Sequence, residues 1–330
     1  MTPSTPSVAD HARPASVLDH PLHGAWALGL LALLAAFPWL ASATGNDFYI
    51  ALVARMLIFA MAATSLNIVL GFGGMVCFGQ AAFIGVGAYT VSILLQEGVA
   101  NAWVAWPLAV GVTALVALVV GFISLRTQGV HFIMITLAFA QMLYYLITSL
   151  KAYGGDDGLS LPGRSEFGFG LDLAHDKTFY YVTLVFAALS FYGVWRLVNA
   201  RFGHVLQAIR ENETRVVAIG YSPLRYKLSA FVLSGALAGL SGVLLANLGA
   251  FVSPSMMHWS QSGMLMIMVI LGGVGYLWGG VLGAVVFLAL EEVLGHFTIH
   301  WQLGLGIVLL GIVFAAPKGL AGLLRGGNKA

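Results

Sequence analysis

The side chains best suited to specific polar chemistry are concentrated in one stretch, residues 196–227, between two long apolar runs. Its charged residues are six bases and two acids: Arg196, Arg201, Arg210, Arg215, Arg225, Lys227, Glu211 and Glu213. Loops rich in Lys and Arg stay on the inner side of a bilayer, so this composition predicts a cytoplasmic loop. Its central part has the pattern of two short amphipathic helices, which indicates contact with a soluble partner.

Within this stretch, residues 199–226 are called the inner loop. Arg210 is one of its predicted functional residues. Glu211, Asn212 and Glu213 are predicted to form the polar head of a short helix, and Gly220 is predicted to end it, since Gly suits the left-handed position after a helix. The alternative interpretation is a solvated loop that rests on lipid headgroups.

Residue patterns for covalent chemistry are missing from the sequence. The phosphate-binding pattern G-x-x-x-x-G-K-[ST] does not occur, so any ATP that is used must be hydrolysed by another polypeptide. Neither metal-ligand spacing nor a nucleophile beside a base is found. The net charge of +2, with its bases in loops, argues against nucleic-acid binding. We therefore expect no catalytic residue, no metal and no cofactor in this chain.

The amino-acid composition is that of an integral membrane protein. Hydrophobic residues make up 59% of the chain and charged residues 8%, far from the values of soluble domains. Because about 20 apolar residues cross a bilayer, the sequence predicts about ten spans in an all-α polytopic bundle. They cover residues 24–43, 48–70, 74–96, 102–124, 129–150, 178–198, 227–250, 262–275, 278–295 and 299–316. The Gly-rich joint at 272–280 is open to interpretation as a span boundary or as a broken or re-entrant segment.

The distribution of charged residues between the loops predicts which side of the membrane each loop faces. Residues 151–177, called the outer loop, are predominantly acidic and face away from the inner loop if all ten spans exist. The predicted organisation is a flexible cytoplasmic tail at 1–23, a membrane domain at 24–316 and a cytoplasmic tail at 317–330. A signal peptide cleaved near residues 41–43 is the less favoured alternative, because the preceding region lacks a basic patch.

Polar residues inside the spans are few. Asn67, Gln80 and Gln141 are predicted to line a pathway, because polar groups in a membrane tend to face the bundle interior. The alternative is that they join helices by hydrogen bonds. Arg55 is expected to reach the outer surface by extending its side chain, and Glu291 is expected to be exposed.

Glycines recur with similar spacing in residues 69–79 and 270–280, which favours a structural repeat, although Gly-rich helices also match by chance. Pairs such as Gly235 and Gly239, or Gly275 and Gly279, are predicted to be close-packing faces.

Several separate segments resemble the M-type permease subunits of branched-chain amino acid ABC transporters. They are LNIVLGFGGMVCFGQAAFIGVGAYT, YGGDDGLS, RFGHVLQAIRENETRVVAIGYSPLRYKLSAF, LSGALAGLSGVLLANLGAFVSP and MVILGGVGYLWGGVLGA, in order from residue 66 to 284. The chain departs from the family at Val216 and Val217, where alanines are common. That family also carries urea, short amides and organic acids, so the resemblance leaves the solute open, with branched-chain amino acids preferred.

The resemblance implies a heterodimer with a second permease, two ATP-binding cassette subunits and a periplasmic solute-binding protein. It implies that the inner loop docks on the ATPase, that Asp156 and Asp157 meet the binding protein, and that the chain lies in a bacterial inner membrane with both termini cytoplasmic. An ion-coupled secondary transporter and a membrane enzyme are the rival classes. The basic inner loop and the scarcity of buried carboxylates disfavour the first, and the missing catalytic residues disfavour the second.

Overall fold

A computed structural model describes residues 24–43, 48–168, 173, 175–297, 300–316 and 319–325. The predicted tail at 1–23 lies outside these residues, as do residues 326–330. Part of the predicted C-terminal tail is described and forms a short helix, α13 (Gly319–Arg325).

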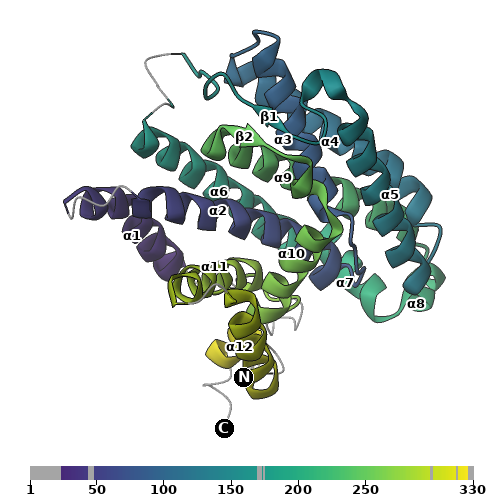
Figure 1. Ribbon diagram of the computed structural model, residues 1–330. Helices are drawn as coiled ribbons and strands as arrows, with labels where there is room; N and C mark the ends of the chain where they lie inside the picture. The colour runs from purple at the N-terminus through teal and green to yellow at the C-terminus, as the bar shows by residue number, and fades with distance from the viewer. Residues whose placement is uncertain are drawn as a thin grey trace, which may run out of the picture.

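The described part of the chain is built from helices, with one short pair of strands (Figure 1). The helices before the inner loop are α1 (Gly24–Ala43), α2 (Phe48–Asn67), α3 (Gln80–Gln96), α4 (Ala102–Ser124), α5 (Val130–Ser149) and α6 (Asp176–Asn199). Those from the inner loop onward are α7 (Arg201–Glu211), α8 (Glu213–Ala218), α9 (Pro223–Gly249), α10 (Trp259–Gly272), α11 (Gly279–Phe297) and α12 (Trp301–Ala315). Three single turns, η1 (Ile68–Phe72), η2 (Lys151–Tyr153) and η3 (Pro254–Met257), and the strands β1 (Leu159–Ser160) and β2 (Phe251–Val252) complete the set.

The predicted all-α membrane class is confirmed, but the count of ten spans is not. Six helices in the described residues are long and apolar enough to cross a bilayer: α2 with η1, α4, α5, α6, α9 and α11. The apolar segments of α1, α3, α10 and α12 are shorter. The predicted third span also began too early, because α3 starts at Gln80 and not at residue 74. Gly74 has φ +67°, a left-handed conformation in which a right-handed helix cannot continue.

Small residues let α9 approach α3 and α4 closely. A Cβ atom added at Gly87 of α3 would collide with the backbone of Gly239 in α9, and one added at Gly235 would meet Ala117 of α4. Such contacts between backbones are typical of helix pairs in membranes, where packing rather than hydrophobic burial drives association. The predicted close-packing face at Gly235 and Gly239 is therefore confirmed.

A second glycine pattern was only half right. Gly279 and Gly283 of α11 do lie against α10, since a Cβ at either position would collide with backbone atoms of Gly273 or Met268. Gly275 belongs to the non-helical joint before α11, with φ +80°, and not to a helical face. The joint at 273–278 thus connects two tightly packed helices.

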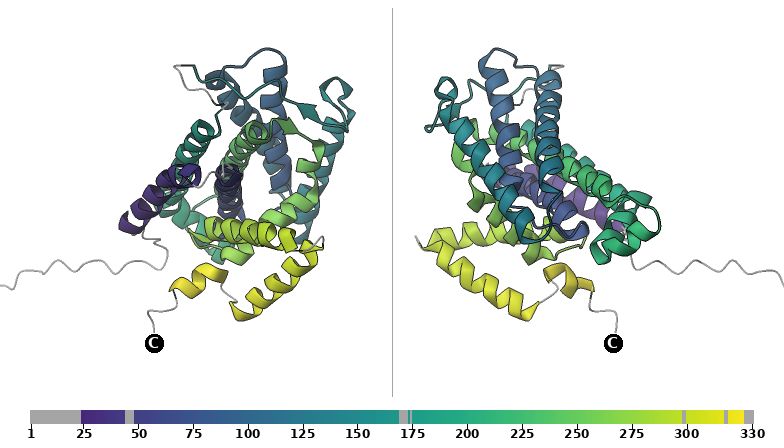
Figure 2. Two further views of the ribbon diagram at one scale, coloured as in Figure 1. Left: turned by 60° about the vertical axis from the view of Figure 1, so that its left-hand side comes forward. Right: turned by 90° about the vertical axis from the view of Figure 1, so that its right-hand side faces the viewer.

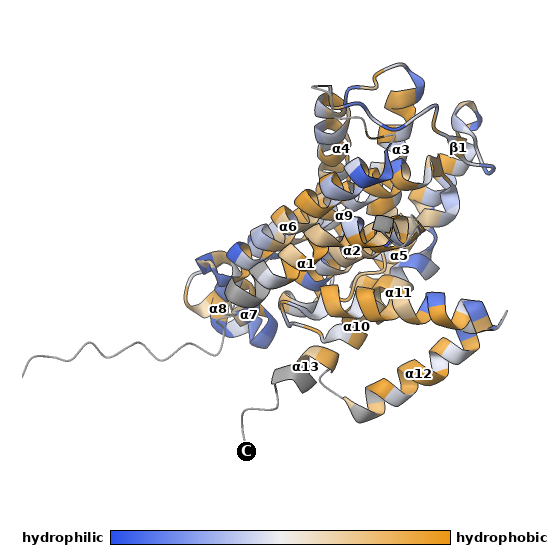
Figure 3. Cartoon of the chain, turned by 90° about the vertical axis from the view of Figure 1, so that its left-hand side faces the viewer, coloured by the Kyte–Doolittle hydropathy of each residue, from blue (hydrophilic) through white to orange (hydrophobic). Residues whose placement is uncertain are grey.

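The two loops lie at opposite ends of the bundle. Strand β1 of the outer loop pairs with β2, which follows α9, through Leu159 and Val252. Figure 1 shows these strands far from α7 and α8, and Figure 3 shows hydrophilic residues gathered at both ends with apolar helices between them. Figure 2 shows α12 and α13 beside the main helical body, next to α11.

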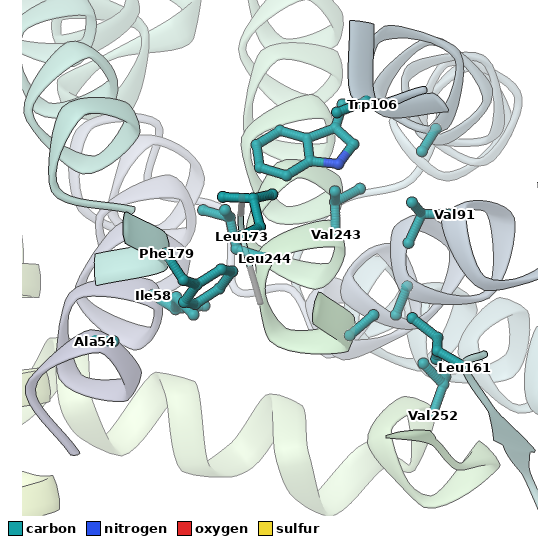
Figure 4. Packing of buried hydrophobic residues seen from close by; sticks show 14 of the residues in the cluster. Ala54, Ile58, Val91, Trp106, Leu161, Leu173, Phe179, Val243, Leu244 and Val252 are labelled. Carbon is teal, nitrogen blue, oxygen red and sulfur yellow. The ribbon is translucent and has the colours of Figure 1, made fainter. Parts of the chain in front are cut away.

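The outer loop also contributes to the core. Figure 4 shows Leu173 beside Val243 and Leu244 of α9, below the ring of Trp106 of α4, and all four are buried. The indole nitrogen of Trp106 donates a hydrogen bond to Ser165 Oγ at 3.1 Å. These contacts fix the outer loop against the ends of α4 and α9.

The expectation that Glu291 is exposed was wrong, whereas the extension of the Arg55 side chain, which is 40% exposed, toward the outer surface stays a prediction. Arg55 Nη2 of α2 lies 3.2 Å from Glu291 Oε1 of α11, and the Glu291 side chain is only 19% exposed. The partners are 236 residues apart in the sequence, so neither local charge nor span position predicted the pair. The two charges offset each other, while the second carboxylate oxygen, Glu291 Oε2, is buried without a hydrogen-bond partner in the described residues.

Candidate functional site

Two interrupted helices meet at the end of the bundle that carries the inner loop. After α2 the chain passes through the π-helical turn η1 and then an irregular segment, residues 73–79, before α3 begins. The second interruption, residues 273–278, separates α10 from α11. They touch at Gly71, where an added Cβ would lie 2.6 Å from the backbone nitrogen of Gly275. These are the two glycine-rich segments whose spacing was similar in the sequence.

Asn67 joins the two interruptions. Its Nδ2 donates a hydrogen bond to the Tyr276 carbonyl at 2.8 Å, and its Oδ1 accepts one from the Gly275 nitrogen at 3.1 Å. The residue is 1% exposed. Backbone groups freed by a broken helix must find partners inside a membrane protein, and the Asn67 amide supplies both a donor and an acceptor. Its predicted role in the pathway stays a prediction.

Arg210 reaches the same place from the inner loop. Its Nη1 donates a hydrogen bond to the Gly71 carbonyl in η1. The side chain also passes over two glycines, since a Cβ at Gly74 would lie 2.7 Å from Arg210 Cγ and one at Gly275 would lie 3.0 Å from Nη1. Arg210 therefore contacts both interruptions, and its guanidinium points into the bundle end.

The two predicted helices of the inner loop are α7 and α8. Asn212 stands between them, and its Oδ1 accepts a hydrogen bond from the Arg215 nitrogen at 3.0 Å, so its visible role is to cap the start of α8. Gly220 follows α8 with φ +91°, the left-handed conformation expected for a glycine that ends a helix.

The residues of the predicted polar head differ in their surroundings: Glu213 contacts the bundle, and Glu211 faces solvent. Glu213 Oε2 accepts hydrogen bonds from Lys227 Nζ at 2.7 Å and from Gln128 Nε2 at 3.3 Å, which ties α8 to α9 and to the α4–α5 connection. Glu211 is exposed. Of the predicted acidic residues, Glu211 is therefore the one most open to a partner.

Two apolar side chains in and just after α8 are exposed, of which the sequence analysis had noted only Val217, as a departure from the family. Val217 is 53% exposed and Ile219 is 67% exposed, whereas the adjacent Val216 is 3% exposed and packs inward. We call Val217 and Ile219 the α8 apolar face. The signal in the sequence is the apolar run at 216–219, which covers more than one side of a short helix, so that some of its side chains must stay exposed.

A cavity of about 250 Å³ with both polar and apolar walls lies beside Arg210. Its walls come from the first interruption, the α4–α5 connection and the inner loop, and include Gly73, Gly74, Gln128, Arg210, Glu213 and Lys227. A second cavity of about 230 Å³ between α1, α2 and α6 is almost wholly apolar. A polar solute would lose its hydration without replacement in the second, so the first is the better candidate for a transport route.

The remaining predicted pathway residues lie deeper. Gln80 is 1% exposed, and its Nε2 donates hydrogen bonds to Ser65 Oγ at 2.8 Å and Ser234 Oγ at 3.0 Å, which joins α3 to α2 and α9. This geometry fits the alternative of a helix–helix contact. Gln141 of α5 is partly buried, and its Nε2 is a buried donor with no hydrogen-bond partner in the described residues. A pathway role for both stays a prediction.

At the other end, Asp156 and Asp157 are exposed in the turn that follows η2. Gly154, Gly155 and Gly158 around them all have positive φ, which explains the glycines by turn geometry. Groups of three or more potential metal ligands are not found among the described residues.

Residues 48–316 match the protein family described as branched-chain amino acid transport system / permease component. The match begins with α2, ends just after α12, and includes both interruptions and the inner loop. The chain belongs to this permease family. It is therefore a multi-pass membrane transport subunit, as the resemblance implied.

Curated relatives agree with this assignment. The permease is 29% identical over 321 residues to the high-affinity branched-chain amino acid transport system permease protein LivM of Salmonella typhimurium, covering 90% of this chain and 75% of the relative. The LivM of Escherichia coli gives the same identity and coverage. A probable LivM of Methanocaldococcus jannaschii is 24% identical over 312 residues, covering 80% of this chain and 90% of the relative. A comparison with solved structures gives no match.

Proposed function

We propose that this permease is one of the pathway-forming subunits of an ABC importer for branched-chain amino acids. The observation that carries the proposal is the family match from α2 to α12, which includes the inner loop and both helix interruptions. ATP is used by a partner, and the chain itself carries out no covalent chemistry and holds no metal or cofactor.

The proposed complex contains a second permease subunit, two ATP-binding cassette subunits and a periplasmic binding protein. The ATPase docks on the inner loop through the α8 apolar face and Glu211. The exposed Asp156 and Asp157 of the outer loop meet the binding protein, because they lie at the opposite end of the bundle.

The proposed route ends at the cavity beside Gly73 and Gly74, from which the solute leaves toward the cytoplasm. The charged groups in its walls do not distinguish the solutes, because Lys227 and Glu213 pair with each other and Arg210 donates to the Gly71 carbonyl. The preference for branched-chain amino acids over the other solutes rests on the family match and on the relatives named for their transport.

Solute competition tests the proposal. Vesicles that contain the assembled importer, with its binding protein outside and ATP inside, should take up labelled leucine. Excess isoleucine or valine should reduce this uptake to background, because all three share the zwitterionic group and a branched apolar side chain. Excess urea or succinate should leave it unchanged. Competition by urea or succinate, without competition by isoleucine, would assign the permease to another solute of the family.

Ten membrane helices are proposed, with α3 and α10 as spans completed by the irregular segments next to them. Both termini and the inner loop are then cytoplasmic, and the outer loop is periplasmic, in a bacterial inner membrane. The pairing of the outer loop with the segment after α9, and of the inner loop with η1, supports this alternation.

Thiol labelling tests the orientation. In a Cys77→Ala background, Asp157→Cys and Glu211→Cys each place one exposed thiol on a loop. In intact cells with a permeable outer membrane, an impermeant reagent should label the first variant only, and in inverted vesicles the second only. Labelling of both variants from the same side would mean that the number of spans between the loops is even.

A further inference from the structure

We propose that Arg210 is the positioning residue that transmits movement of the inner loop to both helix interruptions at once. The inference rests on the proposed function, because it assigns a route for the motion that the ATPase imposes. It goes beyond docking, since the guanidinium of Arg210, a residue that is exposed overall, donates to the Gly71 carbonyl of η1 inside the bundle end.

The contacts form one continuous chain. Arg210, in the last turn of α7, donates to the Gly71 carbonyl, and Gly71 packs on the Gly275 nitrogen. Asn67, one turn before Gly71, holds Gly275 and Tyr276 by two hydrogen bonds. Segments more than 200 residues apart in the sequence are thereby connected within a few bonds of a single guanidinium group.

Glycine is required around this guanidinium for two reasons. Gly74 and Gly275 both have positive φ, and a side chain on either would occupy the space that Arg210 fills. Arginine suits the position because its planar, charged group donates in several directions to backbone carbonyls. The glycines and the arginine therefore form one unit, even though they belong to three separate segments.

The elements that this unit connects are suited to movement. A π-helical turn such as η1 is a weak point in a helix, and such turns occur often at functional sites. The α7–α8 connection is rigid at Asn212, which caps α8, and at Glu213, which is paired with Lys227. A shift of α8 then moves the end of α7, and the hydrogen bond from Arg210 to Gly71 transmits this movement to η1. The hydrogen bonds of Asn67 to Gly275 and Tyr276 transmit it to the second interruption.

The test compares leucine moved per ATP hydrolysed in the complete complex in vesicles. Arg210→Gln keeps length but removes the charge, and this ratio should fall about tenfold, the order of one charge-assisted hydrogen bond. The ATPase should remain attached and should continue to hydrolyse ATP. Arg210→Lys keeps one charged donor and should recover part of the ratio. The matched control, Arg201→Gln in the exposed first turn of the same helix, should equal the wild type.

An equal ratio for Arg210→Gln and Arg201→Gln would overturn the proposal, and so would loss of the ATPase from the Arg210→Gln complex, which would make Arg210 a docking residue. Gly74→Ala provides the second variant if Arg210→Gln does not accumulate. Its Cβ would displace the Arg210 side chain with the charge intact, so it should lower the ratio similarly, and an unchanged ratio would again overturn the proposal. Failure of the proposed function is distinct, because the wild-type chain would then bind no ATPase.

Discussion

Ile219→Asp should detach the ATPase from the permease while leaving the permease folded in the membrane. The side chain is 67% exposed on the α8 apolar face, so the charge costs little in the isolated chain. In a docked complex the same side chain lies in an apolar contact, and burial of an unpaired carboxylate there costs about 2 kcal/mol or more, roughly a thirtyfold loss of affinity. Val217→Asp should act in the same way.

Co-purification measures this effect. A tagged permease should retain its ATPase in wild type and lose most of it in Ile219→Asp, at equal permease yield. Leu150→Asp is the matched control, because Leu150 is an exposed apolar residue, 38% accessible, at the opposite end of the bundle next to α5. If Ile219→Asp and Leu150→Asp retain equal amounts of ATPase, the α8 apolar face does not dock it.

Most of the helices were predictable from hydropathy. In a bilayer the backbone N–H and C=O groups of an apolar run must pair with each other, and a helix pairs them within one segment. The starts and ends of α4, α5 and α6 lie close to the predicted spans. The second interruption was located by its glycines, whereas most of the first was predicted as part of a span that begins at residue 74. The reason is physical: Gly73 and Gly74 leave the helix through a backbone conformation, which a hydropathy window does not detect.

The inner loop was identified correctly as two helices ended by Gly220, since amphipathic pattern and cap chemistry are local properties. The direction of its side chains was not predictable. Glu213 turns toward Lys227 and Arg210 toward Gly71, and both contacts depend on where distant or neighbouring elements lie in space. A sequence shows that such residues are polar, but it does not show which of them a partner can reach.

The same limit applies to the residues within the bundle. Arg55 and Glu291 were interpreted separately, but they form an ion pair between α2 and α11. Asn67 was selected as an intramembrane polar residue, and the structure adds that it bridges the two glycine-rich interruptions. Their similar glycine spacing, visible in the sequence, gave the only indication that the two segments belong together.

Glu291 also invites comparison with an ion-coupled transporter. An ion-coupled transporter needs a carboxylate in the membrane that is free to bind a proton or sodium ion. Glu291 is partly buried, and Arg55 at 3.2 Å offsets its charge, while its Oε2 is buried without a hydrogen-bond partner in the described residues. The expectation that the permease depends on a separate ATPase therefore rests on its family and not on this pair.

Uptake by the purified chain measures this dependence directly. Vesicles that contain the permease subunits alone should take up no leucine above the level of empty vesicles under a proton or a sodium gradient. Adding the ATPase subunits, enclosed ATP and the external binding protein should give uptake that stops when hydrolysis is blocked. Leucine uptake driven by either gradient in the absence of ATPase would contradict the account and identify the protein as a secondary transporter.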